Sequence, residues 1–553
     1  MNKINKRLKL KADSLLSKEK GTIFKDHGGK VSICLVYPNS YHVGMSNLGF
    51  QGVYNILNER TDIVCERAFL PDDEDINQYL KTKTPIFSLE SKTPLQNFHI
   101  VAFSLSFEND YPNICKILKL SNIPCFSEER NKYHPLIIAG GACMCFNPEP
   151  VAPIFDLIFI GEAEESLAEF SDTLTILTAK GDDTKDELKK TAMNIKGLYI
   201  PCFYEIKYDK NGKISSRKTL TNAPSLIEKG FINNLNDSKI TYSIMTPETE
   251  FGDMKLIEIM RGCPWNCRFC MVGHVFSPSR RKSQEAILAE IQKARKFTKR
   301  VGLIGPSLSD YPGIEYILAM GDIDFSITSL RVGSKSKALI ELMKGRRSIS
   351  IAPEAGSGRL RKVINKKISE PEILETSLTI LNSGVETLRL YFMIGLPTET
   401  FSDIEAIIEL IRKIRASTHR GNIVLSVSIF VPKPFTPFQW HPMDSPEAIK
   451  KKLRYIKKAL RGHECIKVFN DLPKYALMQG LFSIGDRRVS KVLKVMTEIE
   501  DWQQATITAG IDSDFYLFRK KEFDEILPWD FIDNKISKKA LWDEYIEAIK
   551  TDF

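Results

Sequence analysis

Three cysteines lie close together in the middle of the chain, in the segment EIMRGCPWNCRFCMVG (258–273). Cys263, Cys267 and Cys270 are spaced C-x3-C-x2-C. Tetrahedral zinc sites more often use two separated C-x2-C pairs, and a disulfide framework needs an oxidising compartment. Thiolates also hold iron–sulfur clusters. Three of them can bind three irons of a [4Fe-4S] cluster and leave the fourth iron open, so the spacing predicts such a site.

The chain has 553 residues, 11 cysteines and a formal net charge of +9. The length predicts about three or four domains. The first residues are basic but lack the apolar stretch of a secretory signal, and no later run approaches the roughly 20 apolar residues of a membrane span. We therefore expect a cytoplasmic protein. In that compartment we expect the eight scattered cysteines to be single buried residues.

Basic clusters recur at 292–300, 359–367 and 450–458. Most such runs are solvated faces of helices, and a smaller share bind nucleic acid. The charge alone therefore does not identify the partner.

The first section alternates short apolar runs with helical patterns, which indicates a parallel sheet covered on both faces, as in a doubly wound α/β domain. The predicted strands are 30–38, 98–106, 134–141 and 155–165. Ligands of such sheets bind outside the carboxyl ends of the strands. Small or polar residues follow the strands there and are equally compatible with tight turns: Tyr41, Gly44, Ser46, Asn47, Ser104, Ser106, Gly140, Gly141, Gly161 and Glu162.

A second alternation begins near residue 256, with predicted strands at 256–261, 301–305, 324–330, 348–352, 387–394 and 424–431. Six strand–helix repeats are fewer than the eight that close a full barrel, so we expect a partial, open barrel. The three cysteines follow its first strand, on the side where barrel enzymes do chemistry.

This combination of cysteine motif and partial barrel, with an aromatic residue before the last cysteine, resembles the radical S-adenosylmethionine superfamily. Members cleave that cofactor reductively to a 5′-deoxyadenosyl radical. The resemblance implies that Cys263, Cys267 and Cys270 ligate the cluster, and that an electron donor such as flavodoxin or ferredoxin serves it. It further implies that the following residues bind S-adenosylmethionine: Phe269, Pro306, Ser307, Arg331, Glu354, Arg389, Gly395 and Val431.

The N-terminal segments YHVGMSNLGF, GGACMCFNPEP and IGEAEE resemble the cobalamin-binding branch of this superfamily, so cobalamin is the expected second cofactor. The ten small or polar residues of the first sheet would then contact it. The chain lacks the D-x-H-x-x-G segment that supplies a lower histidine ligand, because Ser40 stands where the Asp would precede His42. Cobalamin would bind without that histidine, or the domain is a relic that has lost it.

The expected domains are a basic extension (1–27), a cobalamin-binding-like domain (28–180), a connector with a hairpin at Asn211-Gly212 (181–250), the barrel (251–440) and a helical cap (441–553). Several residues near the cap are candidates for the substrate space or for packing: Trp440, His441, Asp486, Arg487, Arg488, Trp502 and Trp529.

The expected reaction is methylation or another modification of an unactivated carbon in a small molecule, lipid or peptide. Three alternatives remain: an RNA- or ribosome-modifying enzyme of the methylthiotransferase type, a ring-forming or rearranging enzyme, and a cobalamin sensor without turnover. The first requires a second set of three cysteines in the N-terminal domain. Cys34 lies in a predicted strand and Cys115 in a predicted helix, which argues against such a set.

Overall fold

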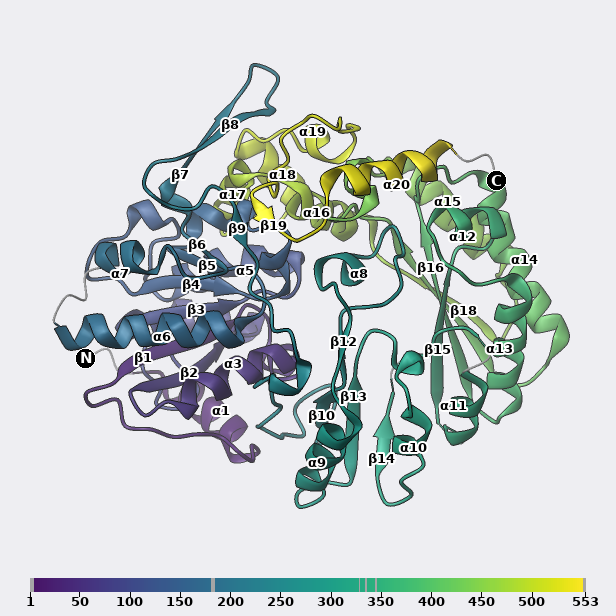
Figure 1. Ribbon diagram of the computed structural model, residues 1–553, viewed down its shortest axis with the longest axis horizontal. Helices are drawn as coiled ribbons and strands as arrows, with labels where there is room; N and C mark the ends of the chain where they lie inside the picture. Colours follow the sequence, from purple (N-terminus) through teal and green to yellow (C-terminus); the bar gives the residue numbers. More distant parts are fainter. Residues whose placement is uncertain (1–3, 181–184, 328, 334–335, 344–345, 551–553) are drawn as a thin grey trace. The chain divides into compact units, whose positions relative to one another are not determined.

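The computed structural model describes residues 4–180, 185–327, 329–333, 336–343 and 346–550 (Figure 1). The chain forms two compact units. Unit 1 comprises residues 1–256, 482–513 and 524–534, and unit 2 comprises residues 257–481, 514–523 and 535–553. The C-terminal residues are thus shared between the units. The predicted domain boundaries stay predictions, and the one at 180/181 meets residues outside the described ranges.

Unit 1 contains a six-stranded sheet of order β2-β1-β3-β4-β5-β6, parallel except for β6. Its strands are β1 (Val31–Tyr37), β2 (Ile63–Phe69), β3 (Ile100–Ser104), β4 (Leu136–Gly140), β5 (Leu157–Phe159) and β6 (Leu198–Tyr199). The order 2-1-3-4-5 is that of flavodoxin-like doubly wound folds, whose ligand site lies at the switch between β1 and β3. The predicted fold class is confirmed, although β2 was not predicted.

The helices of unit 1 bury apolar faces against this sheet, as in the Phe159–Phe170 contact of β5 with α6. They include α1 (Lys6–Ser17), α3 (Leu48–Glu59), α4 (Asp73–Thr82), α5 (Tyr111–Leu120), α6 (Ala163–Lys180) and α7 (Lys185–Ala192). The predicted hairpin consists of β7 (Tyr204–Tyr208) and β8 (Ile214–Thr219), and projects from the unit in Figure 1. Gly212 turns it with φ of 80°, a conformation that favours glycine.

A buried ion pair joins the segment between β4 and β5 of unit 1 to the C-terminal part of the same unit. The Glu149 side chain is fully buried, and Arg487 Nε donates to it at 2.9 Å. The Tyr199 hydroxyl donates to the same carboxylate at 2.5 Å. Although burial alone would raise the pKa of Glu149, Arg487 and Arg217 hold that pKa below its ordinary value. Arg487 is therefore a structural residue here, as are the buried Trp502 and Trp529.

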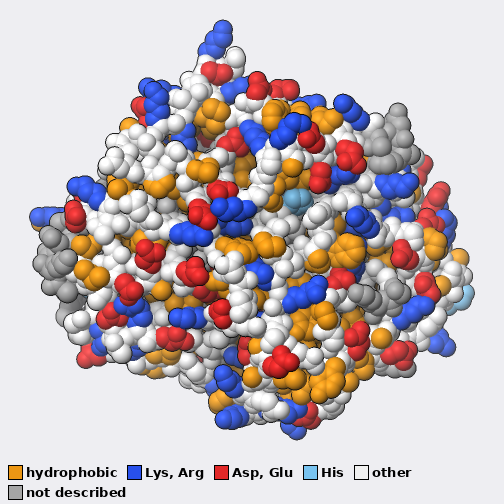
Figure 2. All heavy atoms as spheres, in the orientation of Figure 1, with side chains coloured by type: hydrophobic (Ala, Val, Ile, Leu, Met, Phe, Trp, Pro, Cys, Tyr) orange, Lys and Arg blue, Asp and Glu red, His pale blue; other side chains and the backbone are white. Residues whose placement is uncertain are grey.

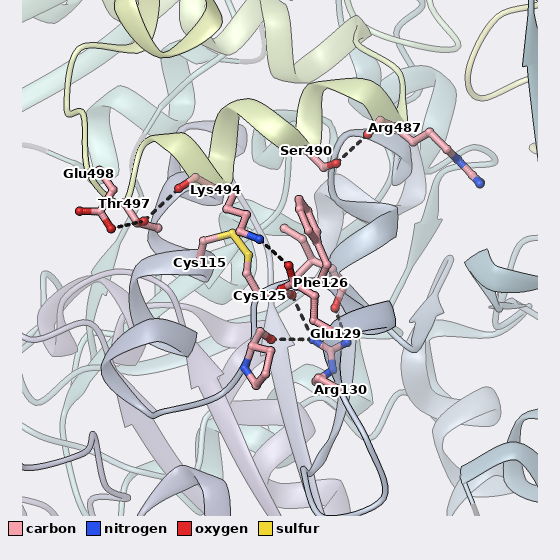
Figure 3. The surroundings of a disulfide bond; sticks show 12 residues. Cys115, Cys125, Phe126, Glu129, Arg130, Arg487, Ser490, Lys494, Thr497 and Glu498 are labelled. Atoms are coloured by element: carbon pink, nitrogen blue, oxygen red, sulfur yellow. Dashed lines mark hydrogen bonds and ion pairs between the residues drawn. A yellow bond between two sulfur atoms is a disulfide. The ribbon is translucent and has the colours of Figure 1, made fainter. Parts of the chain in front are cut away.

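Two of the scattered cysteines form a disulfide, Cys115–Cys125, between α5 and the loop that follows it (Figure 3). Their Cα atoms lie 5.4 Å apart, within the range that a disulfide spans. The expectation of single buried cysteines is wrong for this pair, and also for the exposed Cys202 and Cys465. The helix α17 (Ser490–Val495) lies beside the disulfide and pairs Lys494 with Glu129.

Unit 2 contains a three-stranded sheet β10-β13-β14 and a four-stranded sheet β15-β16-β17-β18. The strands are β10 (Lys255–Glu258), β13 (Arg300–Ile304), β14 (Asp324–Ser326), β15 (Ser348–Glu354), β16 (Thr387–Ile394), β17 (Asn422–Ile429) and β18 (Ile466–Asn470). A parallel bridge between Leu330 and Ile351 links the two sheets. The six predicted strands of a partial barrel are confirmed, apart from residue 328, which lies outside the described residues. The seventh strand, β18, was not predicted.

The helices of unit 2 cover the outer face of this open barrel, and Figure 1 shows several of them along one side of the four-stranded sheet. They include α9 (Gln284–Ala294), α10 (Ile314–Leu318), α11 (Ser336–Leu342), α12 (Gly358–Val363), α13 (Glu370–Asn382), α14 (Phe401–Ser417) and α15 (Pro446–Ala459). The helix α16 (Pro473–Ile484) begins in unit 2 and ends in unit 1. The C-terminal helix α20 (Lys538–Lys550) also belongs to unit 2. It buries Trp440 against Trp542 and Tyr545.

On the face in Figure 2, basic and acidic side chains are interspersed, and no single basic patch dominates. In the described part of the chain, no helix has the length and apolar character needed to span a bilayer.

We predict that Arg487→Ala lowers the stability of unit 1 by about 3–5 kcal/mol, because it leaves the Glu149 carboxylate buried without its main cation. Calorimetric thermal unfolding measures the loss. The exposed Arg454→Ala on α15 is the control, with little expected change. A double variant, Glu149→Leu with Arg487→Met, should recover much of the stability. Equal unfolding temperatures for Arg487→Ala and wild type would contradict a stabilising role of the Glu149–Arg487 ion pair.

Candidate active site at the strand ends of the barrel

The cysteine loop follows β10 and the short strand β11 (Met260–Arg261) and ends in the helix α8 (Met271–Val275). Gly262 starts the loop with φ of 74°, and a Cβ there would lie 2.2 Å from the Phe276 carbonyl oxygen. A Cβ on Gly273 would lie 2.4 Å from the Trp265 carbonyl oxygen. Both glycines are therefore needed for the loop to fold tightly on itself.

A hydrogen-bonded brace joins this loop to the loop after β13. Trp265 Nε1 donates to Asp310 Oδ2 at 2.6 Å, and the buried Ser307 hydroxyl donates to the same oxygen at 2.6 Å. The Arg331 guanidinium lies over the Trp265 ring, 3.5 Å from its centroid. This cation–π contact brings the residue after β14 to the cysteine loop. Three strand ends are thereby held together around Trp265.

Burial raises the pKa of all three thiols, Cys263, Cys267 and Cys270. Backbone N–H groups of the same loop and of α8 act against this on Cys263 and Cys270. The charges of Lys366 and Arg331 act against it on Cys267. Each of these donors or cations favours a thiolate, which is the form that binds iron.

Glu354 ends β15 in a left-handed conformation, with φ of 66°, which a non-glycine residue rarely adopts. Its carboxylate pairs with Lys366 at 3.1 Å, and both side chains are mostly buried. Their charges act in opposite directions on the pKa of Cys267. The predicted cofactor carboxylate thus lies within electrostatic reach of the cysteines, and its present partner is Lys366.

Two of the arginines near the cysteines are already engaged. Arg261 pairs with Glu258 at 2.8 Å. Arg268 donates to the Val363 carbonyl at 3.0 Å and pairs with Glu547 of α20 at 3.2 Å. Arg268 therefore fastens the loop to α12 and to the C-terminal helix. Arg331 remains beside the cysteine loop.

The other predicted S-adenosylmethionine residues lie at or below the ends of later strands. Gly395 turns after β16 with φ of 79°, and its N–H donates to Glu399 at 2.9 Å. Val431 is half-buried after β17, whereas Arg389 lies within β16. Phe269 is half-buried in the cysteine loop and Pro306 is exposed. Their roles toward the cofactor stay predictions.

The thiols of the cysteine loop fit an iron–sulfur cluster better than a single metal ion. Within the described ranges, no group of three or more His, Cys, Asp or Glu side chains is arranged to hold one metal ion. In a [4Fe-4S] cluster each thiolate binds a different iron, so the three sulfurs need not converge on one point. Cys263, Cys267 and Cys270 nevertheless influence one another electrostatically, as expected for neighbouring thiols.

In unit 1, several of the glycines predicted to contact cobalamin support the chain's own loops. A Cβ on Gly44 would meet the Phe69 ring at 2.6 Å, one on Gly141 the Leu105 backbone at 2.6 Å, and one on Gly161 the Gly230 backbone at 2.3 Å. Tyr41 is buried and donates to Glu19 at 2.6 Å. Glu162 accepts from the Ile232 N–H at 2.9 Å. These positions favour the alternative of tight turns.

The remaining polar residues gather at the switch between β1 and β3. Asn47 Nδ2 donates to the Ser106 hydroxyl at 3.1 Å and so joins the loops after these strands. Ser46 and Ser104 are half-buried after β1 and at the end of β3, and the half-buried Gly140 ends the neighbouring β4. Phe107 follows with 43% of its surface exposed. An exposed aromatic ring beside amide and hydroxyl groups suits a large amphipathic ring such as a corrin.

Two family models match the chain: "Radical SAM proteins, N-terminal" over residues 49–201 and "Radical SAM superfamily" over residues 257–411. Together they cover more than half of the chain. The chain therefore belongs to the radical SAM superfamily and is an enzyme of that class, which uses a [4Fe-4S] cluster and S-adenosylmethionine.

An uncharacterized protein of Methanocaldococcus jannaschii is 29% identical over 84% of this chain and 90% of its own length. The tRNA-2-methylthio-N(6)-dimethylallyladenosine synthase of Chloroherpeton thalassium is 25% identical over 36% of this chain, which spans about half (48%) of that protein. A solved structure of the cobalamin-dependent S-adenosylmethionine radical enzyme OxsB shares 16% identity, with a TM-score of 0.45, over 78% of this chain and 56% of that one.

Three polar residues of the site were missed from the sequence: Trp265 as an anchor, Asp310 and Lys366. Asp310 is the last residue of the segment GPSLSD, which follows a predicted strand. Polar residues at that end of a barrel strand commonly bind ligands, so the position was a usable signal. Lys366 stands in a basic run that we interpreted as a solvated helix face. Only the three-dimensional structure pairs it with Glu354.

We predict that Trp265→Phe weakens retention of the cluster, because it removes the indole N–H that donates a hydrogen bond to Asp310. The substitution keeps an aromatic ring beneath Arg331. A hydrogen bond to a charged group contributes about 1.5–3 kcal/mol, so iron should be lost to a chelator about tenfold faster or more. Trp502→Phe is the matched control, since its buried indole nitrogen has no partner among the described residues. Equal rates of iron loss in wild type and Trp265→Phe would refute the brace.

Proposed function

We propose that Cys263, Cys267 and Cys270 ligate a [4Fe-4S] cluster, and that the enzyme modifies an unactivated carbon of its substrate, most simply by methylation. The bound cluster would supply the electron that cleaves S-adenosylmethionine into methionine and a 5′-deoxyadenosyl radical. The observation that carries the proposal is the location of the three thiols after the first barrel strand, where the charges of Arg331 and Lys366 act on Cys267.

The chain's own residues would hold and orient the cofactor. Arg331 is suited to the methionyl carboxylate, because its guanidinium carries fixed donors beside the cysteine loop. Glu354 is suited to the amine or ribose, provided that Lys366 yields one carboxylate oxygen. The turn at Gly395 and the backbone near Val431 would border the adenine. Burial of the site would exclude water from the radical.

We further propose cobalamin as the second cofactor, held at the switch point of unit 1. When bound, it would supply the methyl group. The support is the strand order 2-1-3-4-5 and the gathering of Asn47, Ser104, Ser106 and exposed Phe107 at one edge of the sheet. His42 Nε2 lies 3.4 Å from the Glu250 carboxylate, and 52% of the His42 side chain is exposed. His42 is therefore not preformed as a lower ligand of cobalamin.

The methylthiotransferase alternative is less well supported. It needs three free cysteines in the N-terminal unit, but Cys115 and Cys125 are bonded to each other. Cys34 and Cys65 lie buried in β1 and β2, and Cys143 and Cys145 are also buried.

We predict that Cys267→Ala loses the cluster and that 5′-deoxyadenosine formation under a strong reductant falls to background. Iron, sulfide and 5′-deoxyadenosine are quantified in protein purified without oxygen. The exposed Cys465→Ala is the control and should match wild type. Normal iron content and cofactor cleavage in Cys267→Ala would overturn the cluster assignment.

We predict that wild-type protein purified from cells given iron and cobalamin carries near one corrin per chain, visible in its absorption spectrum. Ser106→Trp should remove the corrin by filling the switch point, while the iron per chain stays unchanged. A wild-type protein with full iron and no corrin would refute cobalamin binding and leave the radical chemistry standing.

A further inference from the structure

The four-stranded sheet of unit 2 has two contrasting faces. On the outer face, Leu388, Leu390 and Phe392 of β16 are fully buried. On the inner face, Tyr391 of β16 is 41% exposed and Phe469 of β18 is 56% exposed. Two large aromatic side chains thus remain open to solvent on the concave side of the barrel.

The register places these rings in one row across the sheet. Tyr391 pairs with Ser426, and Ser426 pairs with Phe469. Strands lie about 4.8 Å apart, so the two aromatic residues are separated by roughly 10 Å, with a small hydroxyl residue between them. The planar ring of a ligand therefore has room to lie over Ser426 and to contact the side chain of Tyr391 or Phe469.

The neighbouring row on the same face carries positive charge. Arg389 pairs with Val424, and Val424 pairs with Lys467. This row lies two residues before the aromatic row, a distance of about 7 Å along the strands. Arg389 and Lys467 therefore flank the apolar Val424, and lie about 7 Å along the strands from the row of Tyr391 and Phe469.

These four side chains have few partners of their own. Arg389 makes one long contact, 3.5 Å to the Ser426 hydroxyl. Among the described residues, neither Arg389 nor Lys467 forms an ion pair, and no ring stacks on Tyr391 or Phe469. Exposed aromatic residues without neighbours cost hydration free energy, and unpaired cations attract anions.

We propose that this inner face binds a nucleotide, with its base over Ser426 between Tyr391 and Phe469 and its phosphate at Arg389 and Lys467. Arg389 would then serve this nucleotide and not S-adenosylmethionine. The role of this nucleotide as the enzyme's substrate rests on the proposed radical function, but its binding does not. The two cations disfavour a neutral or purely apolar ligand. One aromatic row and one cationic row accommodate a single nucleotide, which favours a small molecule over a nucleic acid strand.

The test is calorimetric binding of guanosine 5′-monophosphate to the full-length protein, with guanosine and inorganic phosphate as partial ligands. Phe469→Ala should weaken binding about fivefold or more through lost stacking. Lys467→Ala should weaken it too, and less so at high salt. The matched controls are Phe297→Ala, which is 70% exposed elsewhere in unit 2, and Lys457→Ala on α15. Both should bind like wild type.

Tighter binding of the nucleotide than of guanosine, lost in both inner-face variants, supports the proposal. No binding, or equal binding by wild type and variants, overturns it. Binding of an oligoribonucleotide without the mononucleotide overturns it in favour of RNA, and competition by S-adenosylhomocysteine would assign the face to the cofactor. Because binding is measured without turnover, failure here leaves cluster assembly and cofactor cleavage intact, and the converse also holds.

Discussion

The site of unit 2 depends on one constraint, the parallel pairing of β13 with β14 and of the strands β15 to β18. In a parallel sheet all carboxyl ends lie at the same edge, whatever the distance along the chain. Residues after β11, β13, β14 and β15 therefore meet around the cysteine loop, although Cys263 and Lys366 are about a hundred positions apart. The pairing of Trp265 with Asp310 and the stacking of Arg331 on Trp265 follow from that common edge.

Sharp reversals at this edge force unusual backbone conformations. Glu354, Thr398 and Phe435, which follow or end β15, β16 and β17, all have φ between 60° and 66°. Such conformations cost of order 1–3 kcal/mol each and persist only where the surroundings hold them. Thr398 is held by Arg359, which donates to its carbonyl at 2.9 Å, and Phe435 donates to Gln439 at 2.9 Å. Left-handed residues cluster at functional sites in other proteins as well, and here they border the barrel mouth.

The sequence allowed the barrel strands and the cysteine motif to be predicted because both are local patterns. Continuous apolar runs such as 387–394 and the spacing of three cysteines need no knowledge of distant residues. In contrast, β18 is only five residues long and has exposed Lys467 and Phe469, so its pattern is weak until it pairs with β17. The glycines predicted to contact cobalamin show the same limit. Gly44, Gly141 and Gly161 lie close to Phe69, Leu105 and Gly230, and only the three-dimensional structure shows these approaches. Their contact with cobalamin stays a prediction.

The incomplete barrel also explains why its inner face is available. In a closed eight-stranded barrel, side chains from opposite strands fill the interior. The inner-face aromatics Tyr391 and Phe469 have no opposite strand to pack against, whereas the outward Leu390 and Phe392 are buried. A protein gains nothing in stability by leaving rings exposed on a concave surface, since covering the exposed half of each would contribute about 1 kcal/mol. Their retention is accounted for if a ligand covers them during function, and the cations beside them restrict that ligand to an anion.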